Sequence, residues 1–325
     1  MTEGTQTDNV SVSVITVYYN RQDDVDDSIR SILNQSHPDF EFIIIDDCSK
    51  DDTFQKLSSF ASDPRVRLIR NETNQGFVRN VKMGVELARG KYIAIHGSGD
   101  ISLPERLSRQ AAVLDSEKDI VLVGCFLAHI DKAGTVLNTQ AYNEYIDRND
   151  LLEFNKLSHG EVMYRKSDYL QAGGYREAFR FAQDYDLWLR LTRFGKAKII
   201  QETLYMRTAL EEGASFSPAK IIKQCMFAKL AKDIATSDEG QQKKVLEVVQ
   251  QKGVDAVISI ADPYVQRNIF SRFNYLISKS QVVDASFFVD NARGFYRPYY
   301  SLVFWLSRTA VFSRPLLALY RLKYK

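Results

Sequence analysis

The feature that most constrains the fold is a regular alternation between residues 10 and 130, where short apolar runs alternate with segments of helical spacing. The apolar runs predict strands at Val10–Tyr19, Phe40–Asp47, Val66–Asn71, Tyr92–His96 and Ile120–Ala128. The segments between them predict helices at Asp24–Leu33, Thr53–Phe60, Gly76–Ala88 and Leu103–Leu114. Apolar strands that alternate with helices are typical of a doubly wound α/β fold with a mainly parallel sheet.

Beyond residue 130 the pattern changes. His159–Glu177 predicts a strand, a short helix and a Gly-Gly turn, Phe181–Gly195 predicts a helix, and AKIIQETLYMR predicts a returning strand. A helical region follows, because no glycine or proline interrupts the chain between Ala219 and Ile234. We therefore expect four parts, which are a disordered lead at 1–9, a main domain at 10–215, helices at 216–290 and a tail at 291–325.

Composition argues against two classes of protein. A net charge of +2 gives no general electrostatic reason to bind nucleic acid. The three cysteines, Cys48, Cys125 and Cys225, are too few and too widely spaced for a disulfide framework, and they indicate a reducing compartment. The polar first residues, MTEGTQTDN, lack the basic and apolar regions of a signal peptide.

Acidic residues follow two of the predicted strands. Asp46 and Asp47 end one strand, and Asp100 follows another in the sequence HGSGD, where we expect its carboxylate to be exposed. Ligands of doubly wound sheets bind beyond the carboxyl ends of the strands, so these acids should line one crevice. A single aspartate in such a place can instead cap the next helix, but the set favours a functional site.

The tail from Arg293 to Lys325 contains seven Arg or Lys residues and no acid, among many aromatic residues. Its longest uncharged run, Pro298–Ser307, is too short to span a bilayer. Basic groups with interfacial aromatic residues predict a helix that lies on an anionic membrane surface. The alternative is a helix packed on the main domain, with arginine stems covering apolar surface.

Six segments occur in order and at fitting distances: VSVITVYYN, IIIDDCSKDDT, NQGF, ARGKYIAI…GDISLPERLSRQ, HGEVMYRKS…GGYRE and QDYDLWLRL. Together they resemble family 2 glycosyltransferases of the GT-A nucleotide-sugar-binding fold. The resemblance covers roughly residues 10 to 210, and so makes 10–215 the expected glycosyltransferase domain. It implies a nucleotide-sugar donor and a glycan or lipid-linked acceptor.

The resemblance also assigns roles on the donor side. Asp47 would accept the imide N–H of the base, and Tyr19 and Asn20 would lie against the base or ribose. Arg79 would face the diphosphate, since a guanidinium donates to phosphate oxygens in a fork. A solvent-exposed helix residue is the alternative for Arg79.

For the reaction, the resemblance implies an inverting transfer in which Asp184 is the general base. The family usually has Glu-Asp at this place, and here the neighbour is the neutral Gln183, which should ease ionisation of Asp184. Asp186 is a rival candidate, and His159 is expected on the acceptor side.

Three further residues of these segments have no predicted part in the chemistry. Trp188 and Arg190 are expected to serve helix packing and surface ion pairing, and the sequence assigns His96 no role.

The chain departs from the family at the metal-binding Asp-x-Asp pair. Aligned from Pro104 backwards, the two acids fall at Gly97 and Gly99, and Asp100 is the remaining carboxylate. Three interpretations stay open. Asp100 is a single ligand to Mg²⁺ or Mn²⁺; or the enzyme needs no metal, with groups such as Arg79 and the backbone N–H groups beside the glycines facing the diphosphate; or the donor site has decayed.

The sequence therefore predicts an inverting glycosyltransferase of surface polysaccharide synthesis, located in the cytoplasm and peripheral on the inner face of the membrane. The alternative is a non-catalytic relative that binds a nucleotide or glycan and acts as a scaffold. A nucleotidyltransferase is disfavoured, because VYYNRQDD is not a glycine-rich phosphate loop.

Overall fold

The computed structural model describes residues 10–131, 133–208 and 218–278. The predicted lead at 1–9 and the predicted membrane tail at 291–325 lie outside the described residues. The chain divides into two compact units, of which the first comprises 10–177 and 183–208, and the second 178–182 and 218–278.

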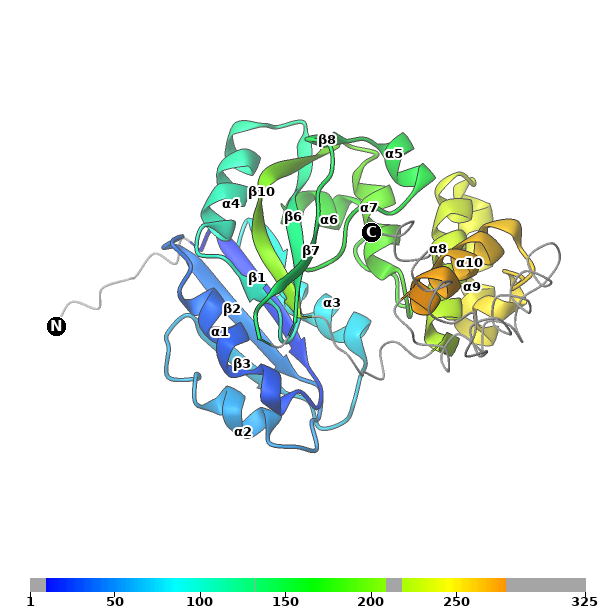
Figure 1. The fold of residues 1–325 in the computed structure, drawn as a ribbon. Helices are drawn as coiled ribbons and strands as arrows, with labels where there is room; N and C mark the ends of the chain where they lie inside the picture. The colour runs from blue at the N-terminus through cyan, green and yellow to red at the C-terminus, as the bar shows by residue number, and fades with distance from the viewer. Residues whose placement is uncertain (1–9, 132, 209–217, 279–325) are drawn as a thin grey trace. The chain divides into compact units, whose positions relative to one another are not determined.

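The first unit is built on one mixed sheet (Figure 1). Its strands are β1 (Val12–Tyr18), β2 (Phe40–Asp46), β3 (Val66–Arg70), β4 (Tyr92–Ile95), β5 (Ile101–Ser102), β6 (Ile120–Ile130), β7 (Val136–Gln140), β8 (Tyr145–Ile146), β9 (Met163–Arg165) and β10 (Lys196–Thr208). The main path runs β3-β2-β1-β4-β9-β6-β10-β5. Strands β1 to β4 are parallel along it, as are β6 and β10, whereas β9 and β5 are antiparallel to their neighbours.

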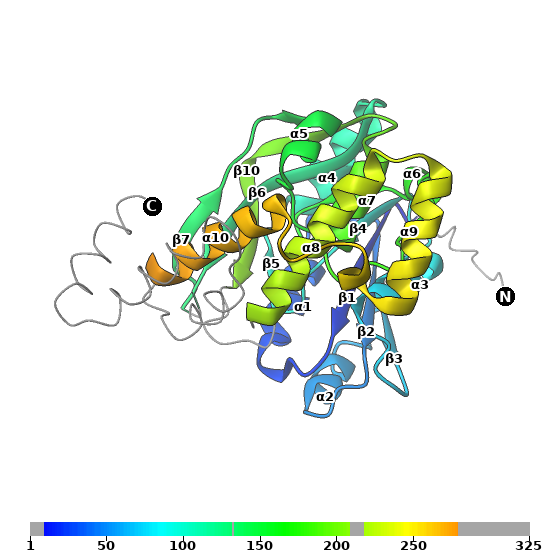
Figure 2. The ribbon, with the colours of Figure 1, turned by 90° about the vertical axis from the view of Figure 1, so that its right-hand side faces the viewer.

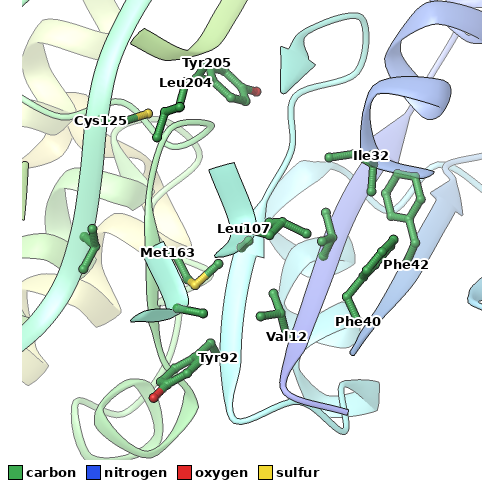
Figure 3. Close-up of a cluster of buried hydrophobic side chains, with 14 of the residues drawn as sticks. Val12, Ile32, Phe40, Phe42, Tyr92, Leu107, Cys125, Met163, Leu204 and Tyr205 are labelled. Atoms are coloured by element: carbon green, nitrogen blue, oxygen red, sulfur yellow. The ribbon is translucent and has the colours of Figure 1, made fainter. Parts of the chain in front are cut away.

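Helices cover both faces of this sheet. They are η1 (Gln22–Asp24), α1 (Asp26–Leu33), α2 (Thr53–Ser58), α3 (Phe77–Leu87), α4 (Arg106–Ser116), α5 (Arg148–Glu153), α6 (Lys166–Gln171) and α7 (Gln183–Leu191). On one face, Ile32 of α1 and Leu107 of α4 join the core cluster with Val12 of β1 (Figure 3). On the other face Ile15 lies against Gly84 of α3, as the alternation of side chains along β1 requires.

The sequence predictions for residues 10–130 are confirmed, with one correction. The helix predicted from Leu103 begins at Arg106, because the residues before it form the short strand β5. Ser102 of β5 pairs with Tyr205 of β10, and the backbone N–H of Leu103 donates to Leu204. Strand β5 therefore brings the turn after β4 next to β10.

The second unit is helical, as predicted for the part of 216–290 that the structure describes. It contains α8 (Pro218–Ala235), α9 (Glu239–Lys252), η3 (Val254–Ala256) and α10 (Pro263–Ser278), and α8 packs with both α9 and α10 (Figure 2). Phe179 and Phe181 belong to the same unit and pack against the Phe227 ring of α8. Among the helices described, none combines the length and apolarity that crossing a bilayer requires.

Candidate active site

Asp47 follows β2 directly and is buried, and its carboxylate ties that strand to the loop before α3. Its Oδ1 accepts hydrogen bonds from Asn71 Nδ2 at 2.8 Å and from the Gln75 N–H at 2.7 Å, and its Oδ2 accepts from the Gly76 N–H at 2.9 Å. Asp46 turns the other way, and its Oδ2 accepts from the Ser49 N–H. The structure therefore gives Asp47 a loop-holding contact that sequence reasoning missed, and base recognition by Asp47 stays a prediction.

The loop after β1 lies against the loop after β2. The N–H of Asn20 donates to Ser49 Oγ, and its Oδ1 accepts from the Lys50 N–H. Asn20 has a φ of 51°, a left-handed conformation that asparagine tolerates better than most residues. Tyr19 beside it is 41 % exposed. The predicted contacts of Tyr19 and Asn20 with a base or ribose fit this placement and stay predictions.

Arg79 lies in the first turn of α3 with its side chain 61 % exposed. Its Nε donates to Glu177 at 3.2 Å, and both residues line a cavity of about 560 Å³ between the end of β3 and α3. Asp100 does not line that cavity, and no ion pair in the described residues joins Arg79 to it. The structure thus does not bring these two predicted donor residues together.

Asp100 is largely buried, with its side chain 13 % exposed, so the expectation of an exposed acid is wrong. Its Oδ2 accepts a hydrogen bond from the Tyr205 hydroxyl at 2.6 Å, and that hydroxyl accepts from the Gly97 N–H at 2.9 Å. Burial raises the pKa of Asp100, and the nearby Arg207 opposes the rise. Tyr205 and Asp100 together fix the turn after β4.

The two glycines of this turn are required by its packing. A Cβ at Gly97 would lie 2.2 Å from Asp100 Oδ2, and a Cβ at Gly99 would lie 2.9 Å from the Cβ of Asp24. Gly99 also has a φ of 92°, which other residues rarely adopt. Gly97, at the first position of the usual Asp-x-Asp pair, therefore leaves the space that the Asp100 carboxylate occupies.

Arg207 lies near the end of β10, and sequence reasoning missed both it and Tyr205. Arg207 Nη2 donates to Ser158 Oγ at 2.7 Å, and its Nε is 3.9 Å from Asp100 Oδ2. The Ser158 N–H and hydroxyl in turn donate to the buried carboxylate of Glu161. The sequence did contain one signal for this pair. Tyr205 and Arg207 are two residues apart on a strand, and such residues point to the same face of a sheet.

Asp184 lies in the first turn of α7, as predicted. Its Oδ1 accepts from the Tyr185 N–H at 2.8 Å. Burial raises the pKa of Asp184, and the Arg207 charge opposes that rise. The rival Asp186 is 2 % exposed and forms ion pairs with Arg176 at 3.1 Å and with Arg190 at 2.6 Å. These pairs occupy Asp186 and leave Asp184 as the better candidate base.

Arg190 and Trp188 pack α7 into the unit. The prediction that Arg190 makes a surface ion pair is wrong, because its side chain is 8 % exposed and its pair with Asp186 is buried. Trp188 is fully buried, as a packing residue should be. Neither position needs a role in the chemistry.

His159 is held neutral in an aromatic cluster. Its Nε2 is 2.5 Å from the Tyr175 hydroxyl, and Phe77 and Trp188 pack edge-on against its ring. Burial lowers its pKa to about 3. The acceptor-side role of His159 stays a prediction.

His96 has a structural explanation. Its Nε2 lies 3.0 Å from Ser28 Oγ and its Nδ1 3.2 Å from Ser102 Oγ, so that it joins α1 to β5 behind the turn.

The residues around Asp100 do not fit a divalent metal. The described residues contain no group of three or more His, Cys, Asp or Glu side chains arranged to hold one. Mg²⁺ demands near-octahedral oxygen ligands, whereas the Asp100 Oδ2 already accepts from Tyr205 and faces a guanidinium. The second carboxylate beside this turn, Asp24, pairs with Arg21 at 3.3 Å, so both acids of the turn already have partners.

Sequence comparison assigns the chain to a family. The family model described as Glycosyl transferase family 2 matches residues 13–171. EpsE of Bacillus subtilis is 33 % identical over 199 residues, which cover 60 % of this chain and 71 % of that protein. The chain belongs to glycosyl transferase family 2.

As a family 2 member the chain is a glycosyltransferase, and its relatives include enzymes of surface polysaccharide synthesis. The O-antigen biosynthesis glycosyltransferase WbnJ of Escherichia coli is 34 % identical over 186 residues, covering 55 % of this chain and 71 % of that protein.

Solved structures confirm the GT-A fold of this family 2 glycosyltransferase. Staphylococcus aureus TarS 1-349 in complex with UDP-GlcNAc superposes with a TM-score of 0.58 at 17 % identity, covering 90 % of this chain and 86 % of that one. Mannosyltransferase PcManGT from Pyrobaculum calidifontis, in complex with GDP-Man and Mn²⁺, gives a TM-score of 0.56 at 14 % identity over 95 % and 83 % of the two chains.

Proposed function

We propose that this glycosyltransferase moves a sugar from a nucleoside-diphosphate donor to a glycan or lipid-linked glycan, with inversion, in the assembly of a surface polysaccharide. The observation that carries the proposal is Asp184, a carboxylate in the first turn of α7 that no ion pair occupies in the described residues. The O-antigen and UDP-GlcNAc-bound relatives support the polysaccharide and the nucleotide donor.

The environment of Asp184 suits a general base. A base that accepts a proton from a hydroxyl works best when its pKa approaches the operating pH. Burial moves the pKa of Asp184 in that direction, and the Arg207 charge limits the rise. In an inverting transfer the acceptor hydroxyl attacks the anomeric carbon, Asp184 takes the hydroxyl proton, and the nucleoside diphosphate leaves from the opposite side.

The test is Asp184→Asn, measured as release of nucleoside diphosphate in the presence of donor and acceptor. We expect kcat to fall by about 10²- to 10⁴-fold, the usual contribution of a general base, with donor binding retained. Gln183→Asn is the matched control, because it changes the neighbouring side chain without removing a carboxylate. The anomeric configuration of the product, measured by NMR, tests inversion.

Two results would contradict the proposal. Full activity in Asp184→Asn would remove Asp184 as the base. A wild-type protein that binds a nucleotide but transfers no sugar from any donor would favour the scaffold alternative.

We further propose that the enzyme works in the cytoplasm, peripheral on the inner face of the membrane, held there by the basic aromatic tail at 291–325. Seven positive charges without an acid support attraction to anionic lipid. Co-sedimentation of the full chain with vesicles tests this. We expect binding to phosphatidylglycerol vesicles that salt reverses, and equal binding to phosphatidylcholine vesicles would contradict it.

A further inference from the structure

Two guanidinium groups lie beside the turn after β4, where the family resemblance implies a metal-binding pair. Arg207 approaches Asp100 from β10, with 3.9 Å between Nε and Oδ2. Arg106, at the start of α4, is fully buried beneath the same turn, and its guanidinium lies 4.8 Å from the centre of the Tyr205 ring. We propose that Arg207, supported by the charge of Arg106, binds the donor diphosphate and neutralises the leaving group without a metal. This inference rests on the transferase function proposed above.

Space is limited at the turn after β4. A metal pair at positions 97 and 99 would need two further side chains, and a Cβ at Gly97 would already lie 2.2 Å from Asp100 Oδ2. With the Asp100 carboxylate in its present place, a side chain at position 97 has no room, so the pair could form only if Asp100 moved away from Tyr205. Asp100 is a positioning residue, which holds Tyr205 and faces Arg207.

The hydrogen bonds of the Arg106 guanidinium go to neutral groups. Its Nη1 donates to Ser102 Oγ at 2.9 Å and its Nη2 to the Ile95 carbonyl at 3.0 Å, both of which are neutral acceptors. Its buried Nε has no hydrogen-bond partner, and no carboxylate in the described residues lies within ion-pair distance of the group. Burial lowers the pKa of Arg106, and the negative charges of Glu161 and Asp100 offset that effect only in part. A bound anion beside the turn would therefore stabilise the buried guanidinium further.

The guanidinium of Arg207 is anchored on one side only. Nη2 is fixed by Ser158, which Glu161 orients in turn, while Nη1 makes no hydrogen bond within the described residues. The side chain is 35 % exposed, so the guanidinium is both anchored and reachable. A planar guanidinium held on one side can present its remaining N–H groups to phosphate oxygens, which is the geometry that diphosphate binding needs.

Arg207 also connects the donor end to the candidate base. Its charge lowers the pKa of Asp184 and of Asp100 against the effect of burial. Arg79, which the sequence suggested for the diphosphate, is instead paired with Glu177 at the cavity beside α3, which Asp100 and Arg207 do not line. The structure therefore favours Arg207 over Arg79 as the diphosphate ligand.

The experiment is calorimetric titration of the full chain with UDP, GDP, dTDP and CDP, in EDTA and with Mg²⁺ or Mn²⁺. We expect one nucleotide to bind equally well in EDTA and with metal. Arg207→Gln should weaken that binding by about 10- to 100-fold, and should leave binding of the corresponding nucleoside unchanged, because only phosphate contacts are lost. Arg207→Lys should restore part of the affinity, since it keeps the charge but not the fork.

Two further variants sharpen the test. Arg109→Gln is the matched control, because Arg109 is an exposed arginine that pairs with Glu202 on the same strand β10, and we expect it to bind as the wild type does. Arg79→Gln is the rival, and a loss of diphosphate binding in this variant alone would overturn the inference. Thermal unfolding of each variant confirms that it is folded. If Arg207→Gln does not fold, Arg207→Lys takes its place in the binding measurements.

The outcomes separate the inference from the proposed function. Binding that is lost in EDTA and recovered with Mn²⁺ or Mg²⁺ would overturn the metal-free inference and leave the transferase function intact. The metal-free inference would also be overturned if Arg207→Gln bound each of UDP, GDP, dTDP and CDP with the same affinity as the wild type. A wild type that binds none of the four nucleotides under either condition would overturn both.

Discussion

Asp47 and Asp100 both follow buried parallel strands, but their surroundings differ. The Asp47 carboxylate accepts from Asn71 and from two backbone N–H groups within 29 residues along the chain, and it holds a loop. The Asp100 carboxylate meets Tyr205, 105 residues away, and it takes part in a charge cluster. The same residue type at the same kind of position therefore stabilises the fold in one place and shapes the electrostatics of the site in the other.

The largest expected difference between the two acids is in stability. Asp47→Ala should lower the free energy of unfolding by about 3–5 kcal/mol, because three partly buried hydrogen bonds lose their anionic acceptor. Asp100→Asn should change it by less than about 1 kcal/mol, since burial already disfavours the ionised form and the Tyr205 hydrogen bond survives. Urea denaturation of both variants checks this, and equal losses would remove the distinction.

Gly97→Ala should destabilise the turn that holds Asp100 and leave the loop that Asp47 holds unchanged. The new Cβ would lie 2.2 Å from Asp100 Oδ2, so the carboxylate must move away from Tyr205, at a cost of about 1–3 kcal/mol. The loss should be smaller when the change is made in Asp100→Gly, which removes the clashing group. A double-mutant cycle measures this coupling, and simple additivity would contradict the packing described for the turn.

His96 makes the Asp100 region sensitive to acid. Burial lowers its pKa from the ordinary 6.5 to about 3, so its contribution to stability is complete above pH 6.5 and is lost as the pH falls toward 3. At pH 5 the loss should be about 2 kcal/mol. The stability difference between wild type and His96→Gln should therefore shrink by that amount between pH 7 and pH 5, as measured by urea denaturation at each pH. A difference that stays constant would mean that His96 titrates normally.

The smallest effect is expected for Arg79→Gln. Arg79 is 61 % exposed and Glu177 is 35 % exposed, and surface pairs of this kind contribute at most about 1 kcal/mol. The melting temperature should therefore hardly change. A large fall in the melting temperature would show that the Arg79–Glu177 pair stabilises the protein more than its exposure suggests.

The sequence predicted those parts of the fold and site that depend on local pattern. Strands β1 to β4, the helices between them and the place of Asp184 in the first turn of α7 follow from periodicity and capping. The short strand β5 could not be predicted, because two residues carry no periodicity. Arg207 and Tyr205 were missed for a related reason, since only the pairing of β10 with β5 and β6 brings them to Asp100.

The position of β10 also decides when the site can exist during synthesis. The chain emerges from the ribosome with Asp100 and Arg106 long before Tyr205 and Arg207, which belong to the last strand of the first unit. Contacts that span about a hundred residues form only after the segments between them have been ordered, and the entropy of closing so long a loop must be overcome first. A nascent chain that ends before Tyr205 has the carboxylate of Asp100 and the arginine of Arg106, but lacks the strand that completes their cluster. Among the described residues, the last strand to be translated is therefore the one that completes the candidate site.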